Sequence, residues 1–386
     1  MAPLTTIPAT ETLPAGPYFS AADIAFIQAE IPAILRGQLS TARWMERFEQ
    51  EVAAAAGTRY AIAFPSCTAA LESALAALGV GPGDEVLVPA QTFIATAMAV
   101  HLVGAKPVVC DIDAATHCLA PGEIARRAGR RAKGVILVHM GGLITPHLAE
   151  IENECGRLGL WLLEDCAHAH GAKWRGRPAG SIGRAGCFSY YPTKILTCGE
   201  GGALTTNDRR IAETARSLQN RGRDIEASEE LYIRPGRNNR VPEISALLGC
   251  VQHGHLSEFV RRRNEIASYY RRRLQVEAPA LEAQAHPPDV VHSYWKFLVN
   301  LPRAICRQKL QSFLANRGVA IHWSYWPPVH LMPVLRSLYG YAPGECPVAE
   351  RVLASNICLP IDPRLTEAQM KLVMDSLVEA IGCQLA

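Results

Sequence analysis

Between about Arg59 and Asp165 the sequence alternates short apolar runs, rich in β-branched residues, with longer runs that favour helix. Because the short runs are apolar along their whole length, we expect strands buried on both faces of a parallel sheet wrapped by helices. This pattern predicts the α/β fold class and directs the search for chemistry to the carboxyl ends of the strands. The expected strands are YAIAF, EVLV, PVVCDI, GVILVH and LWLLED, and the expected helices are TAALESALAALG, ATAMAVHLVG, residues 123–128 and LAEIENECGRLG.

The remainder of the chain predicts a second, smaller unit. A helical run at residues 208–220 is followed by a polar loop rich in Arg and Gly at residues 221–240. An amphipathic stretch at residues 243–274 then leads to the apolar segment SYWKFLVNL, a helix near residues 304–317 and a last helix from about residue 367. With 386 residues, the chain has room for a large domain at 1–250 and a small C-terminal α+β domain at 251–386.

Composition excludes several classes of partner and location. The formal net charge is +3, from 39 basic and 36 acidic side chains, which leaves no field that would hold nucleic acid. The 12 cysteines are scattered without a C-x-x-C pair, as in a reduced cytosolic protein, and MAPLTTIPATETLPAGPY has no signal-peptide pattern. The most apolar window, residues 60–81, contains Pro65 and Glu72, which argues against a membrane span. We therefore expect a cytoplasmic protein without a nucleic-acid or membrane partner.

The first chemical signal is FPSCTAALESAL, in which an expected strand runs directly into a helix. The first turn of that helix, Ser66 to Ala69, presents unpaired backbone N–H groups that can bind a phosphate. A plain N-cap role for Ser66 or Thr68 is the alternative interpretation.

Two further signals lie downstream. In LLEDCAHAHGA, Glu164 and Asp165 end an apolar strand, where a carboxylate can pair with a cationic ring nitrogen or merely cap a helix. In FSYYPTKILTCGEGGALTT, Lys194 is flanked by aromatic residues and glycines, and desolvation would make its amine nucleophilic. The alternative for Lys194 is an ordinary surface lysine. The sequence thus contains, in this order, a helix start that can bind a phosphate, an acid at the end of a strand and a lysine. Together they favour a cofactor site.

In this order the motifs resemble those of the DegT/DnrJ/EryC1/StrS family of sugar aminotransferases, which use pyridoxal 5′-phosphate and have fold type I. The resemblance extends from about Pro17 to the last helix. It is carried by SCTAALESALAALGVGPGDEVLVPAQTFIAT, VHMGGL, EDCAHAHGA, FSYYPTKILTCGEGG, RNNRVPEISA, SYWKFLV and CLPIDPRLT.

The resemblance implies a role for each matching residue. Lys194 would be the lysine bonded to the cofactor, and would later move a proton between substrate carbon and cofactor. Asp165 would contact the pyridine nitrogen, and His168 would lie beside the ring hydroxyl. The other implied contacts are Thr68, Ala69 and Ser189 to the phosphate, Phe93 on the ring, and Asn238 to the phosphate of the neighbouring subunit, which requires a homodimer with shared active sites.

Some residues depart from the family pattern or have weaker support. Cys67 stands where many members have glycine, and the family's N-Y-R is Asn238, Asn239 and Arg240 here. Candidates for substrate contact, or alternatively for simple packing, are Arg240, His322, Tyr325 and His330. No metal site is expected, because His101, His117, His139, His147 and His170 form no ligand spacing.

The predicted function is amino transfer from a glutamate- or glutamine-type donor to a keto-sugar, a nucleotide-linked keto-sugar or a keto-cyclitol. One alternative is a dehydratase or an amino-hydroxybenzoate synthase on the same scaffold. A sugar dehydratase branch replaces the lysine with histidine, so Lys194 favours transamination. The other alternative is a regulator that binds the cofactor without turnover.

Overall fold

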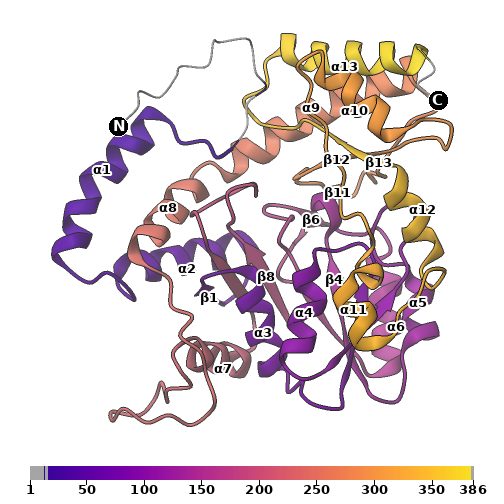
Figure 1. Ribbon diagram of the computed structural model, residues 1–386. Coiled ribbons are helices and arrows are strands. Elements are labelled where there is room, and N and C mark those ends of the chain that lie inside the picture. Colours follow the sequence, from indigo (N-terminus) through magenta and orange to yellow (C-terminus); the bar gives the residue numbers. More distant parts are fainter. Residues whose placement is uncertain (1–12, 14–15, 384–386) are drawn as a thin grey trace.

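A seven-stranded sheet lies at the centre of the protein in the computed structural model, which describes residue 13 and residues 16–383 (Figure 1). The strand order is β1-β9-β8-β5-β4-β2-β3, and every neighbouring pair is parallel except those that include β9. The five predicted strands are confirmed, as is the α/β class. The strands are β1 (Tyr60–Phe64), β2 (Glu85–Pro89), β3 (Lys106–Cys110), β4 (Ala132–Val138), β5 (Trp161–Asp165), β8 (Ala185–Ser189) and β9 (Gly202–Thr206).

Helices cover this sheet, and each predicted helix between residues 68 and 220 is present. Helix α3 begins where predicted because the Ser66 side chain caps it, accepting a hydrogen bond from the Ala69 N–H. Helix α3 packs against α4 and α7, while α2 lies against β1. The helices of this part are α1 (Ala21–Arg36), α2 (Arg43–Ala56), α3 (Cys67–Ala77), α4 (Ile94–Leu102), α5 (Pro121–Arg127), α6 (Leu148–Leu158) and α7 (Arg209–Gln219), with the 3-10 turn η1 at Met140–Gly142.

Side chains satisfy the backbone groups of Ala63 on the free edge of β1. The Ala63 N–H donates to Glu49 Oε1 at 2.8 Å, and the Ala63 carbonyl oxygen accepts from the Gln219 side chain. Arg216 in turn pairs with Glu49. An edge strand with satisfied backbone groups is a poor template for pairing with another chain.

The stretch at residues 243–274 forms two helices, α8 (Glu243–His253) and α9 (Leu256–Glu277), where the sequence predicts one amphipathic segment. The break falls at Gly254, a residue type that disfavours helix. Beyond α9, the helices predicted near residues 304–317 and from residue 367 are both present. The later elements are β10 (Glu282–Ala283), β12 (Phe297–Asn300), α10 (Arg307–Ala315), η2 (Val329–Leu331), α11 (Pro333–Tyr339), α12 (Pro347–Ser355), β13 (Asn356–Leu359) and α13 (Glu367–Gly382).

Two apolar clusters lie inside the molecule. One surrounds the large sheet and also includes Leu335 of α11 and Leu353 of α12. The other joins α9, α10 and α13 to the small sheet β10-β12-β13 through residues such as Tyr270 and Phe297. A further small sheet, β11-β6-β7, contains β6 (Lys173–Trp174), β7 (Arg177–Pro178) and β11 (Val290–Val291). The division of the chain at residue 250 stays a prediction.

Within the described residues, every helix is too short or too polar to cross a bilayer. The N-terminal segment whose sequence lacks a signal-peptide pattern lies mostly outside the described residues, since residues 1–12 and 14–15 are not among them.

Candidate active site

A cavity of about 490 Å³ lies where the carboxyl ends of β1, β5 and β8 meet. This volume is typical of small-molecule and cofactor sites, which run from about 300 to 1,000 Å³. The strands end together there because they run parallel, as the sequence pattern predicts. Of the predicted site residues, the cavity is lined by Thr68, Phe93, Asp165, His168, Ser189, Lys194 and Tyr325.

The amino end of α3 forms one wall of the cavity. Ser66, Cys67 and Thr68 line it, and the Ala69 N–H donates to Ser66 Oγ at 3.2 Å. A Cβ on Gly202 would lie 2.3 Å from the Ser66 carbonyl carbon, so glycine is required where β9 passes this turn. Close passage of β9 thus holds the first turn of α3 in place. The Ala69 amide, predicted to bind phosphate, is occupied by the cap.

Asp165 lies at the base of the cavity and is buried. Its Oδ2 accepts a hydrogen bond from the Thr96 hydroxyl at 2.7 Å, and its Oδ1 accepts from the Ala167 N–H at 3.1 Å. Thr96 is hydrogen-bonded to Thr92 at 2.6 Å. These contacts fix the direction of the Asp165 carboxylate. Thr96 was not predicted as a site residue, although it belongs to the same QTFIAT segment as Phe93.

Lys194 also lines the cavity and is half-buried. Burial lowers the pKa of its amine from 10.5 to about 8, although the negative charge of Asp165 opposes this change. About one molecule in ten therefore carries the neutral, nucleophilic amine at pH 7. The predicted desolvation of Lys194 thus has a physical basis in the structure.

Three rings close the cavity beside Lys194. The His168 imidazole stacks on the Trp295 indole, with ring centres 3.8 Å apart and planes at 10°. His168 Nε2 and the Tyr325 hydroxyl share a hydrogen bond of 2.8 Å. Burial, with a smaller contribution from the charges of Lys194 and Lys296, holds the pKa of His168 well below its ordinary value, so the ring is neutral. Trp295 was missed as a site residue, although its segment SYWKFLV is one of the motifs.

Tyr325 adopts a backbone conformation that is rare for a bulky residue, with φ at 61°. Strain of this kind costs on the order of 1–3 kcal/mol and persists where the surroundings enforce it. Phe93 lies at the mouth of the cavity with 57% of its surface exposed, and its ring centre is 6.2 Å from that of Tyr325. Tyr325 thus lines the cavity, and its predicted contact with substrate stays a prediction.

Asn238 and Arg240 do not line the cavity of their own chain. The backbone of Asn238 is bridged to that of Asn220, and Arg240 donates to Asn220 Oδ1 at 2.6 Å. Both residues therefore lie against the end of α7. The predicted contact of Asn238 with a neighbouring subunit stays a prediction.

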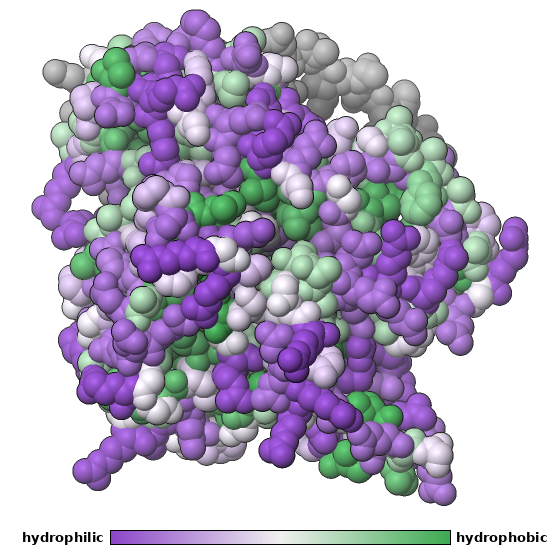
Figure 2. Space-filling model, turned by 180° about the vertical axis from the view of Figure 1, so that it is seen from behind, coloured by the Kyte–Doolittle hydropathy of each residue, from purple (hydrophilic) through white to green (hydrophobic). Residues whose placement is uncertain are grey.

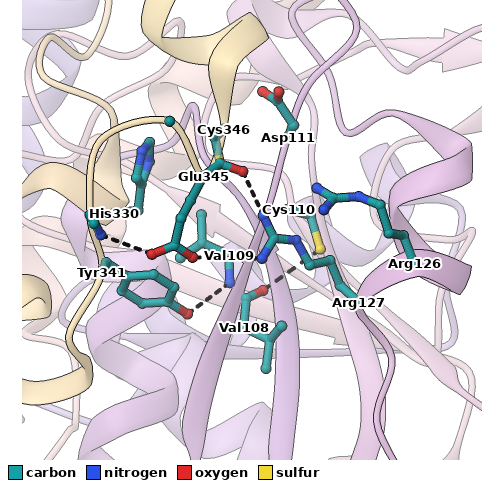
Figure 3. A network of polar contacts seen from close by, with 12 residues as sticks. Val108, Val109, Cys110, Asp111, Arg126, Arg127, His330, Tyr341, Glu345 and Cys346 are labelled. Atoms are coloured by element: carbon teal, nitrogen blue, oxygen red, sulfur yellow. Dashed lines mark hydrogen bonds and ion pairs between the residues drawn. The ribbon is translucent and has the colours of Figure 1, made fainter.

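The two remaining substrate candidates lie outside the cavity. His330 is fully buried and shares a hydrogen bond of 3.0 Å with Glu350, in a network that also contains Tyr341, Glu345 and Cys346 (Figure 3). His330 therefore does not line the cavity of its own chain, and its predicted contact with substrate stays a prediction. His322 is exposed, and its backbone is bridged to that of Cys358.

His139, Glu164 and Cys166 form a buried group whose potential metal-ligating atoms lie within 4.8 Å of one another. Their contacts are explained by hydrogen bonds between protein groups. Glu164 shares a hydrogen bond of 2.9 Å with His139 Nε2 and accepts from the N–H groups of Gly180, Ile182 and Gly183. This group connects β5 to the loop before β8.

The sequence matches the DegT/DnrJ/EryC1/StrS aminotransferase family over residues 22–378. It is 35% identical to the dTDP-3-amino-3,4,6-trideoxy-alpha-D-glucose transaminase of Streptomyces venezuelae, with 92% of each chain covered. It is 37% identical to the erythromycin biosynthesis sensory transduction protein EryC1 of Saccharopolyspora erythraea, covering 83% of this chain and 86% of that one.

Among solved structures, DesV of S. venezuelae superposes with a TM-score of 0.86 at 34% identity, covering 92% of this chain and 94% of that one. The predicted fold type I is thereby confirmed. The chain belongs to the DegT/DnrJ/EryC1/StrS aminotransferase family and depends on pyridoxal 5′-phosphate.

Proposed function

We propose that this aminotransferase moves an amino group from a glutamate- or glutamine-type donor to the keto group of a sugar, a nucleotide-linked sugar or a cyclitol. One observation carries the proposal: Lys194, whose pKa is lowered to about 8, shares a single cavity with the Asp165 carboxylate. A nucleophilic amine and a buried acid facing the same space are what amine exchange on a pyridine cofactor requires. The similarity to a transaminase of a dTDP-linked sugar supports the acceptor class.

The residues present fit pyridoxal 5′-phosphate. The α3 amino end offers N–H groups for a phosphate, and the Ser189 hydroxyl lies on the same cavity wall. His168 Nδ1 is buried and has no hydrogen-bond partner in the described part of the chain, so it is free for a polar substituent of a ring. When bound, the cofactor supplies an aldehyde that condenses with amines and a ring that withdraws electrons from the adjacent carbon.

Each wall of the cavity has a separate task in this proposal. With the cofactor bound, the Asp165 carboxylate, directed by Thr96, would hold a proton at the ring nitrogen, and Phe93 would lie against the ring. Thr68 and Ser189 would bind the phosphate. Lys194 Nζ would accept the proton that leaves the substrate carbon, because an amine with a pKa near 8 exchanges protons readily near neutral pH.

His168 and Tyr325 orient the reacting groups. The neutral His168 ring, stacked on Trp295, keeps the Tyr325 hydroxyl at 2.8 Å from its Nε2. Stacked rings exclude water from this side of Lys194, which preserves the lowered pKa of the amine. Of the substrate candidates from the sequence, Tyr325 is the one that lines the cavity in its own chain.

Two other functions remain as alternatives. A dehydratase or an amino-hydroxybenzoate synthase would use the same cofactor site, and its products would contain no newly aminated sugar. A regulator is suggested by the similarity to EryC1, an erythromycin biosynthesis sensory transduction protein. Regulation without turnover requires neither the lowered pKa of Lys194 nor the directed Asp165 carboxylate, so the site favours the enzyme.

We further propose a homodimer whose partners complete each other's sites. The loop at residues 221–240 projects from the molecule, and Figure 2 shows apolar side chains on it at the lower right. Four large apolar side chains of this loop are each about half exposed: Ile225, Leu231, Tyr232 and Ile233. Exposing so much apolar surface to water is unfavourable for a loop that contacts no partner. Burial against a second copy would remove these side chains from water and bring Asn238 towards the partner's phosphate site. A cytoplasmic location is proposed from the free cysteines, most of them buried.

The direct test incubates purified protein with glutamate or glutamine and a panel of keto-sugars, nucleotide-linked keto-sugars and keto-cyclitols, and detects amines by mass. We expect one acceptor class to gain an amino group in place of its keto oxygen. Lys194→Ala should abolish this gain while the protein remains folded. Loss of water without gain of nitrogen would instead identify a dehydratase, and no change in any acceptor would favour the regulator.

A further inference from the structure

The segment that joins β11 to β12 carries Trp295, which lines the active-site cavity, and Lys296, whose charge acts on Lys194. The Trp295 indole Nε1–H donates to the carbonyl oxygen of Thr193 at 2.7 Å, directly before Lys194. One face of the same ring stacks on His168. The indole is thus a fixed wall between the C-terminal part of the chain and the loop that carries Lys194.

Two ammonium groups approach this one ring. Lys194 Nζ lies 4.3 Å from the ring centre of Trp295, and Lys296 Nζ lies 4.9 Å from it. Each can be attracted to the electron-rich face of an indole. The two positive charges repel each other, and the charge of Lys296 contributes to the lowered pKa of Lys194.

Lys296 lacks an anionic partner. It is half-buried, and no ion pair joins it to an acidic side chain in residues 13 and 16–383. Lys133 and Lys371, by contrast, pair with Asp84 and Asp375. A half-buried ammonium without a counter-charge raises the local potential and attracts anions from solution.

The positive potential extends over this side of the cavity. Burial is the main cause of the lowered pKa values of His168 and His322, and the charge of Lys296 adds to both. Of the acids that line the cavity, the buried Asp165 opposes this positive charge at Lys194, whereas Glu200 is exposed. The cavity therefore has an acidic base at Asp165 and a basic side at Lys296.

We propose that Lys296 binds an anionic oxygen group of the substrate and thereby holds the substrate along the Trp295 wall next to Lys194. The inference rests on the proposed function, whose donors carry carboxylates and whose nucleotide-linked acceptors carry phosphates. Both groups offer the oxygens that an ammonium binds. Pairing would offset the charge of Lys296 and reduce its repulsion of Lys194.

The experiment measures binding of two probes to cofactor-loaded protein by calorimetry. Glutarate represents the donor carboxylates without an amine to react, and inorganic pyrophosphate represents the acceptor phosphates. The variants are Lys296→Met, which removes the charge, and Lys296→Arg, which keeps it. Lys371→Met, on the exposed side of α13, is the matched control for loss of one surface charge.

We expect Lys296→Met to weaken binding of at least one probe about tenfold, with Lys296→Arg and Lys371→Met near wild type. A loss confined to glutarate identifies the donor carboxylate as the ligand, and a loss confined to pyrophosphate identifies the acceptor phosphate. Equal affinities in wild type and Lys296→Met, or no binding of either probe at millimolar concentration, would overturn the inference. Failure of the proposed function would appear elsewhere, as absence of aminated product with wild-type protein.

Discussion

The carboxylates of Glu164 and Asp165 are adjacent in β5 and serve opposite faces of the sheet. Successive strand residues point to opposite faces, and the contacts follow that rule. Glu164 is fully buried among the N–H groups of Gly180, Ile182 and Gly183, whereas Asp165 faces the cavity and Thr96. One strand end therefore holds a structural acid and a proposed catalytic acid side by side, and substitutions should separate the two roles.

Glu164→Gln should lower the free energy of unfolding by roughly 2–4 kcal/mol. An amide offers one oxygen where the carboxylate accepts three backbone N–H groups and contacts His139, and its NH₂ group would face donors. Urea unfolding of the purified variant measures the change. Glu150→Gln, an exposed position on α6, should leave stability near wild type. Equal stability of both variants would contradict the buried role.

Asp165→Asn should leave unfolding nearly unchanged and reduce turnover about a hundredfold or more. The amide oxygen can accept from the Ala167 N–H while the NH₂ group donates to the Thr96 hydroxyl, but the side chain no longer supplies the negative charge that holds a proton at the ring nitrogen. Single-turnover rates with the amino donor, compared with cofactor retention on a desalting column, separate rate from binding. Near-normal turnover would assign Asp165 a purely structural role.

The amine of Lys194 should titrate near pH 8. Its pKa is lowered from 10.5, so the neutral, reactive fraction appears as the pH rises through about 8 and is lost below it. Labelling of the cofactor-free protein with an amine reagent over a pH series, with the Lys194 peptide quantified by mass, measures the midpoint. Because Lys296 contributes positive charge, Lys296→Met should move the midpoint to higher pH, and Lys296→Arg should not. A midpoint at the ordinary lysine value would contradict the effect of burial.

Lys194→Ala and Asn238→Asp should complement each other when their subunits exchange. If Asn238 contacts the neighbouring subunit's cofactor, a mixed dimer has one site with both lesions and one with neither. Statistical mixing would then return about a quarter of wild-type activity. Each variant carried alone through the same exchange procedure is the control. Proven exchange without recovered activity would place Asn238 outside the partner's site.

Much of the active site was predictable because its residues lie where the sequence predicts that a strand ends or a helix begins. Thr68, Asp165 and Ser189 lie where an apolar strand ends or a capped helix begins, and parallel strands bring such ends to one edge of a sheet. Local hydrophobicity and capping chemistry therefore determined the strands, the start of α3 and most of the cavity floor. The reduced pKa of Lys194 also follows from a pattern, aromatic and glycine neighbours, that predicts burial.

Only the tertiary structure decided which distant segments pack around the active-site cavity. Trp295 reaches Thr193 across about a hundred residues, and Tyr325 reaches His168 across a larger separation, so no local periodicity reports either contact. Packing of the chain also decided the partners of two substrate candidates. His330 is hydrogen-bonded to Glu350, and Arg240 donates to Asn220, although the sequence indicates neither contact. Trp295 and Lys296 are neighbours in the sequence, and only the packing of the chain places this pair beside Lys194. Contacts of this kind depend on how β12 and the loop before it dock onto the large sheet, which side-chain patterns within one segment do not encode.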